Sequence, residues 1–95
     1  MSEGLRITEE TVPKLGPGVR LREDKARGQW SLMAPERMYI LDDIGLVIVQ
    51  AMDGETSIGA MADDFAERFG APRNEVLADV IDMLQNFADK GVVSE

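Results

Sequence analysis

The segments VRLRE at residues 19–23 and QWSLM at residues 29–33 decide the fold of this chain. Both largely alternate apolar with polar side chains, the period-two pattern of a β-strand with one wet face. The loop between them, residues 24–28, ends in a glycine, as loops of β-hairpins often do. The two segments therefore predict a hairpin. We expect Trp30 to anchor it against the helices, because large aromatic side chains dominate burial in small cores.

A third strand is predicted directly after the hairpin. Ala34-Pro35 ends the second strand, because proline donates no ladder hydrogen bond and favours an extended residue before it. Residues 37–41, RMYIL, then resume an extended pattern. Side chains alternate across a strand, so only one of two sets can face a helix. These sets are Arg37, Tyr39 and Leu41, or Met38 and Ile40.

The next segment, residues 44–52, is apolar nearly all round. Its β-branched residues also suit a buried strand, but the N-cap candidates Asp42 and Asp43 before it favour a buried helix. Asp53-Gly54 supplies the stop.

Two longer helices complete the pattern. The first begins at Thr56 or Ser57 and ends at Gly70. Pro72 suits the first turn of the second, which Gly91 closes. The apolar stripe of this last helix comprises Val76, Leu77, Val80, Ile81, Leu84, Phe87 and Ala88.

These elements predict an α+β fold with winged helix-turn-helix-like ingredients, in which a small three-stranded antiparallel sheet is followed by a three-helix bundle. Residues 18–95 form the expected domain. Residues 1–17 are rich in glycine and proline and have little apolar periodicity, so we expect a flexible arm that joins the domain only through Val12 or Leu15.

The composition excludes several kinds of site. The 95 residues include no cysteine and no histidine, which removes disulfides, thiolate ligands and the commonest proton shuttle. The acidic pairs Asp42-Asp43 and Asp63-Asp64 are better explained as caps or solvated faces than as metal ligands. We therefore expect no metal, no cofactor and no catalysis by this chain. The lack of a signal peptide and of an apolar run of about 20 residues predicts a soluble cytoplasmic protein that binds no membrane.

The charge is unevenly distributed along the chain. Residues 1–37 carry seven Lys and Arg against six Asp and Glu, whereas residues 38–95 carry three against twelve. An acidic helical half repels phosphate backbones, so nucleic-acid binding is disfavoured. A winged-helix DNA-binding protein stays open as one alternative on topology, and a generic protein-interaction module as another.

From Gly18 to Val93 the chain resembles the PqqD family. No single motif is specific, but their joint order and spacing carry the resemblance. The motifs are GVRLR at 18–22, RGQW at 27–30, APER at 34–37, DGET at 53–56, FGAP at 69–72, Glu75-Val76, Asp79-Val80 and Met83-Leu84.

The resemblance implies a peptide chaperone of pyrroloquinoline quinone (PQQ) biosynthesis, which serves as the recognition element for a ribosomally made precursor peptide. It implies that the chain binds the precursor peptide PqqA and presents it to PqqE, a radical S-adenosylmethionine (SAM) enzyme that crosslinks a glutamate to a tyrosine. We expect a monomer, although an exposed edge strand leaves a strand-exchanged dimer open.

The resemblance also implies a groove in which the peptide lies as an added strand between residues 37–41 and the last helix. Core packing is the alternative explanation for the apolar members, and it is favoured for Ile40, Leu41, Val80, Ile81 and Leu84. Met83, with Met38, would accommodate peptide side chains loosely. The expected peptide-binding residues are Arg37, Met38, Tyr39, Ile40, Leu41, Leu77, Val80, Ile81, Leu84 and Gln85.

Overall fold

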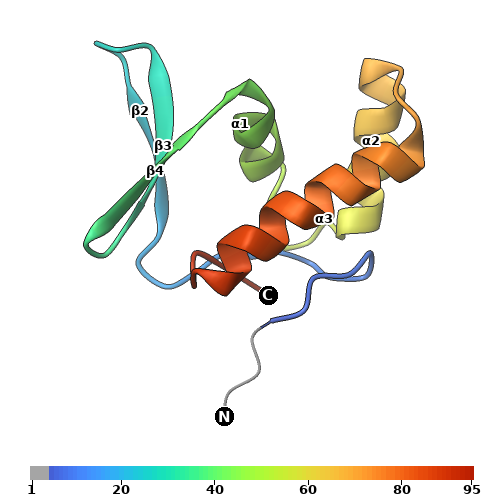
Figure 1. Ribbon diagram of the computed structural model, residues 1–95, viewed down its shortest axis with the longest axis horizontal. Coiled ribbons are helices and arrows are strands. Elements are labelled where there is room, and N and C mark those ends of the chain that lie inside the picture. Colours follow the sequence, from blue (N-terminus) through green and yellow to red (C-terminus); the bar gives the residue numbers. More distant parts are fainter. Residues whose placement is uncertain (1–4) are drawn as a thin grey trace.

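The computed structural model describes residues 5–95, and Figure 1 gives the arrangement of its elements. The three-stranded sheet lies at one side, α2 lies at the opposite side, and α3 runs between them. In chain order the elements are β1 (Lys14–Leu15), β2 (Arg20–Asp24), β3 (Gln29–Ala34), β4 (Arg37–Leu41), α1 (Asp43–Gln50), α2 (Ile58–Phe69), α3 (Arg73–Asp89) and β5 (Val93–Ser94).

The main sheet has the order β2-β3-β4, with both pairs antiparallel. Its register aligns Leu21 with Leu32 and Leu32 with Tyr39, so these three side chains share the face that meets the helices. This sheet and the three helices confirm the predicted α+β class, and the predicted third strand matches β4 residue for residue.

The sheet closes over a small core of its own. Leu32 is fully buried, and Leu41 packs beside it against Val49 of α1 and Val92 after α3. Trp30 points to the same face but is only half-buried and belongs to neither core cluster of the described residues. Leu32, and not the predicted Trp30, therefore anchors the sheet to the helices. Leu32 lies at the centre of the sheet, whereas Trp30 lies nearer its outer end.

Local chemistry predicts the helix starts and the end of α2, but α1 ends at Gln50, before the predicted stop at Asp53-Gly54. The Asp42 side chain caps α1 by accepting a 2.7 Å hydrogen bond from the Gly45 amide. Ser57 caps α2 in the same way, and Gly70 ends that helix in the left-handed conformation that favours glycine. Pro72 lies at the N-cap of α3.

The larger core lies between α2, α3 and residues 5–17, which we call the N-terminal segment. Its buried members include Ile58, Met61 and Phe65 of α2 and Leu84 of α3. Ile7, from outside any helix or strand, is part of the same cluster and is only 4% exposed.

The prediction of a flexible arm is wrong for the described residues 5–17. Ile7 and Pro13 are buried, and β1 pairs antiparallel with β5 at the opposite end of the chain. The carbonyls of Glu9 and Thr11 each accept a 2.9 Å hydrogen bond from the start of α2. The glycine and proline residues of this segment therefore do not prevent it from packing against the domain. Residues 1–4 of the expected arm lie outside the described residues.

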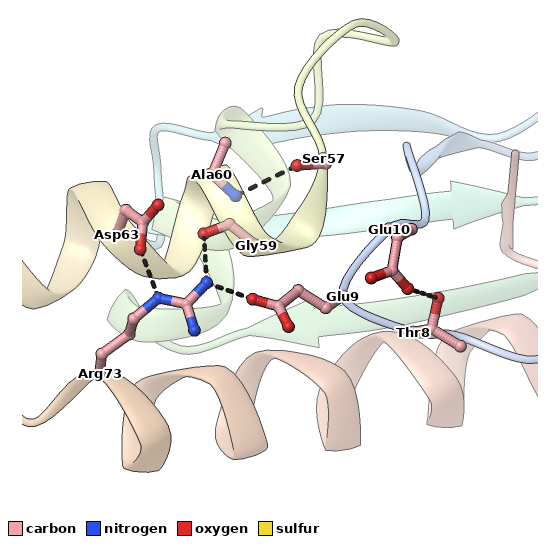
Figure 2. Close-up of polar contacts among 8 residues, drawn as sticks. All are labelled: Thr8, Glu9, Glu10, Ser57, Gly59, Ala60, Asp63 and Arg73. Atoms are coloured by element: carbon pink, nitrogen blue, oxygen red, sulfur yellow. Dashed lines mark hydrogen bonds and ion pairs between the residues drawn. The ribbon is translucent and has the colours of Figure 1, made fainter.

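An ion-pair cluster holds the same segment from outside (Figure 2). The Arg73 guanidinium bonds the carboxylates of Glu9 and Asp63, and donates to the Gly59 carbonyl at 3.3 Å. The pKa of the Arg73 guanidinium is raised, most strongly by its hydrogen bond to Glu9 and next by its hydrogen bond to Asp63. A Cβ on Gly59 would lie 2.7 Å from the Glu9 side chain, so only glycine permits this close approach. Arg73 therefore links α2, α3 and the N-terminal segment.

Candidate functional site

The site centres on β4, an edge strand. Among residues 5–95, β4 pairs only with β3, so one side of its backbone carries no partner strand. Such an edge offers unpaired amides and carbonyls to another chain.

The C-terminal half of α3 lies alongside this edge. The Arg37 guanidinium donates to the Lys90 carbonyl at 3.3 Å. The Tyr39 and Phe87 rings meet edge-on with centroids 5.7 Å apart, and Lys90 Nζ lies 5.6 Å from the Tyr39 centroid. Early residues of β4 therefore meet late residues of α3, and the two elements run in opposite directions.

Between β4 and α3 lies a cavity of about 440 Å³, which we call the β4–α3 groove. Lys90 donates to the Asn86 side-chain oxygen at 2.8 Å, so this end of the groove is polar, whereas the rest of its wall is apolar and aromatic. The lining residues are Met38, Tyr39 and Ile40 of β4, and Met83, Asn86, Phe87 and Lys90 of α3.

The β4 residues predicted for the site divide as the strand alternation requires. Tyr39 and Leu41 point toward the helices, and Leu41 is 8% exposed and belongs to the core. Met38 and Ile40 point outward and are 54% and 60% exposed. Arg37 lies at the end of the groove against Lys90. Members of both faces therefore border the groove, because it opens along the strand edge.

The predicted α3 residues lie elsewhere. Val80 and Leu84 are buried in the larger core, and Leu77 and Ile81 pack against it. Gln85 is engaged on the other side of α3. Its side chain donates to the Leu5 carbonyl and accepts from the Ile7 amide, both at 2.8 Å.

Sequence reasoning missed Asn86, Phe87 and Lys90 as groove residues, although it noted Met83 and placed Phe87 on the apolar stripe. Their spacing from Met83 matches one side of a helix. That spacing was a usable signal, but the stripe of α3 is wide enough to meet two partners. Which edge of this apolar stripe faces the sheet depends on how α3 crosses β4.

Residues 5–95 contain no cluster of three metal-ligating side chains. No helix in the same range is long and apolar enough to cross a membrane.

Comparison with known proteins identifies the family. The model of the family "Coenzyme PQQ synthesis protein D (PqqD)" matches residues 29–93. The chain belongs to the PqqD family. A relative from Rhizobium meliloti (strain 1021), named PqqA binding protein, is 49% identical over 82 residues, which cover 86% of this chain and 84% of the relative. Another relative of the same name, from Rhodopseudomonas palustris (strain HaA2), is 42% identical over a match that covers 99% of this chain and 92% of the relative.

Solved PqqD structures have the same fold. The solution structure of the PqqD part of Methylobacterium extorquens PqqCD, described as a functional, stand-alone recognition element for ribosomally synthesized and post-translationally modified peptides, superposes with a TM-score of 0.81. It is 32% identical, and the match covers 94% of this chain and 95% of that one. The crystal structure of PqqD from Xanthomonas campestris has a TM-score of 0.56 at 43% identity, with coverage of 88% and 93%. These comparisons confirm both the family and the fold predicted from the sequence.

Proposed function

We propose that this chain is a non-catalytic peptide chaperone of PQQ biosynthesis, which binds the precursor peptide PqqA on β4 and presents it to the radical SAM enzyme PqqE in the cytoplasm. The observation that carries the proposal is the unpaired edge of β4 beside the β4–α3 groove. The name PqqA binding protein, carried by relatives up to 49% identical, supports PqqA as the ligand.

The binding chemistry is the addition of a strand to a sheet. The unpaired backbone of β4 supplies hydrogen bonds whatever the peptide sequence, whereas the groove selects side chains. Met38 and Ile40 are more than half exposed, so a bound peptide would remove apolar surface from water on that side. Tyr39, backed by Phe87, offers an aromatic wall with little conformational freedom to lose.

The geometry of a strand supports presentation. Side chains of a strand alternate between its two faces, so a peptide paired with β4 turns every second side chain toward the groove. The others point away from it and stay accessible to an enzyme. The chain itself contains no cysteine or histidine, so the chemistry falls to the partner.

Binding as an added strand is tested from the peptide side, which leaves the fold of the protein untouched. PqqA is synthesised with one backbone amide N-methylated at a time, and each affinity is measured by calorimetry. Pairing with β4 predicts that methylation at alternate amides weakens binding roughly tenfold or more, because a ladder bond is lost and a methyl group intrudes. The amides in between serve as matched controls. Equal effects at all positions would contradict strand addition.

Presentation is tested separately with purified PqqE. The proposal predicts that crosslinked PqqA forms in the presence of this chain, and that formation falls when Ile40→Ser weakens the groove. Equal product without the chain would overturn presentation and leave peptide binding standing.

A DNA-binding winged helix is the weaker candidate. The exposed positions of α3 include Glu75, Asp79, Asp82 and Asp89, which would repel the phosphates that flank a major groove. Binding to duplex DNA that weakens steeply with salt would favour this alternative over the peptide chaperone.

A further inference from the structure

A second apolar cavity, of about 340 Å³, lies between α1, α2 and α3. Val47, Phe65 and Val76 form part of its wall. At its mouth Ile44 is 70% exposed and Phe69 is 61% exposed. Large apolar side chains that gather around an open cavity mark a surface that binds something.

This cavity and the β4–α3 groove lie along the same helix, α3. Met83 lines the groove, whereas Asp79 and Val76, four and seven residues earlier, line the second cavity. The spacing of these residues, and of Asn86 and Lys90 beyond them, places all five on one side of the helix. One wall of both hollows is therefore the same side of α3.

The opposite walls come from consecutive elements, β4 and α1. Ile40 of β4 borders the groove, and Asp43 and Ile44, at the start of α1, border the second cavity. Gly45, the residue after Ile44, faces Met83, because a Cβ on this glycine would lie 3.5 Å from the Met83 methyl carbon. A peptide that runs along β4 in the direction of Leu41 is therefore directed toward the second cavity.

We propose that this second cavity is a further subsite of the peptide groove, and that it takes an apolar side chain of PqqA from beyond the stretch paired with β4. The inference rests on the proposed function. The wall passes from Ile40 in β4 to Ile44 in the first turn of α1, so the peptide residue that reaches the cavity lies beyond the stretch paired with β4. A cavity of about 150 Å³ in another protein accepts benzene, so this volume suffices for a leucine, isoleucine or phenylalanine side chain.

The charges at the rim of the cavity determine which peptide residues are favoured next to that apolar side chain. Asp43 and Asp79 line it, and its lining includes no Lys or Arg. Arg68 lies over the Phe65 and Phe69 rings, but its charge is paired with Asp64 at 3.0 Å. The acidic rim favours Lys or Arg over Asp or Glu next to the apolar side chain of the peptide.

The experiment combines shortened peptides with two exposed variants. PqqA is trimmed one residue at a time from each end, and its affinity is measured for the wild type, Ile44→Ser and Ile40→Ser. We expect Ile44→Ser to bind full-length PqqA about tenfold more weakly, as the loss of one large apolar contact implies. It binds a peptide trimmed to the β4 stretch as the wild type does. Ile40→Ser weakens the binding of both peptides.

Wild-type affinity of Ile44→Ser for full-length PqqA, with Ile40→Ser still weakened, would overturn the second subsite and leave the proposed function intact. An equal loss for full-length and trimmed peptides would also overturn it, because the effect would then not depend on the peptide segment. If wild-type protein binds no PqqA at all, the proposed function itself fails.

A matched pair of variants tests the acidic rim. Asp79→Asn removes a charge that lines the cavity, and Asp82→Asn removes one from an exposed neighbouring position of α3. We expect Asp79→Asn to weaken the binding of full-length PqqA about twofold to threefold at physiological salt, and Asp82→Asn to weaken it less. Equal or tighter binding by Asp79→Asn would overturn the preference for a basic flank.

Discussion

The two sides of α3 differ in what covers them. On one side the chain's own residues 5–11 are held by Gln85, which bonds the backbone of Leu5 and Ile7. On the other side Met83, Asn86 and Phe87 face the open β4–α3 groove. The same helix therefore closes the core with one face and offers binding surface with the other. Substitutions on the covered side should change stability, and substitutions on the open side should change peptide affinity.

The largest expected effect lies on the covered side. Ile7→Ala removes a side chain that is 4% exposed within the larger core. Truncating a buried isoleucine costs about 2–4 kcal/mol of unfolding free energy through lost burial and the cavity left behind. Urea denaturation measures this loss. Arg6→Ala, at the exposed neighbouring position, is the control. An unchanged midpoint for Ile7→Ala would mean that residues 5–11 do not pack in solution.

On the open side, Tyr39→Ala should weaken PqqA binding about tenfold to thirtyfold. The ring forms the aromatic wall of the groove against Phe87, and tyrosines in such positions often dominate binding energy. Calorimetry provides the measurement. Tyr39→Phe keeps the ring and should bind within about twofold of the wild type. Undiminished binding by Tyr39→Ala would show that PqqA does not bind in the β4–α3 groove.

Gln85 and Asn86 provide the comparison between neighbouring residues. Gln85→Ala leaves the Ile7 amide and the Leu5 carbonyl without their partner, at a cost of about 1–2 kcal/mol in stability. PqqA affinity should not change. Asn86→Ala should show the reverse, with stability within about 0.5 kcal/mol of the wild type and weaker binding. If both variants lose affinity equally, the two sides of α3 are not functionally distinct.

The smallest effect lies away from both sides, in the loop before α2. The Asp53 carboxylate accepts hydrogen bonds from the Glu55 amide and from the Thr56 hydroxyl and amide, which lower its pKa below 3.8. Because the folded pKa is depressed, this stabilisation is present above pH 3.8 and is lost as pH falls through the folded value. Asp53→Ala should therefore unfold at lower urea than the wild type at pH 7, and the gap should close at low pH. A gap independent of pH would exclude the carboxylate as its cause.

Local chemistry made much of this fold predictable. Alternation identified the hairpin strands, and the extended run after Pro35 identified the strand at residues 37–41. Capping limited two helix starts to Asp42 or Asp43 and to Thr56 or Ser57, and placed a helix end at Gly70. Each of these signals acts over only a few residues, so it can be read without knowledge of the rest of the structure.

Contacts between distant parts of the chain could not be read in the same way. The pairing of β1 with β5 joins two-residue segments from opposite ends of the chain, too short for any periodicity to reveal. Gln85 has the same sequence signal whether its partner is a bound peptide or Leu5. The choice depends on where the N-terminal segment packs, which is a property of the whole fold.

The most direct test of the account follows backbone and side-chain amide signals of labelled protein as PqqA is added. We predict saturating shifts at residues 38–40, at Met83 and along residues 86–90. The Gln85 side-chain amide and residues 5–11 should stay unchanged. Shifts confined to Gln85 and residues 5–11, with β4 unaffected, would contradict the central claim that the open side of α3 and the edge of β4 form the peptide site.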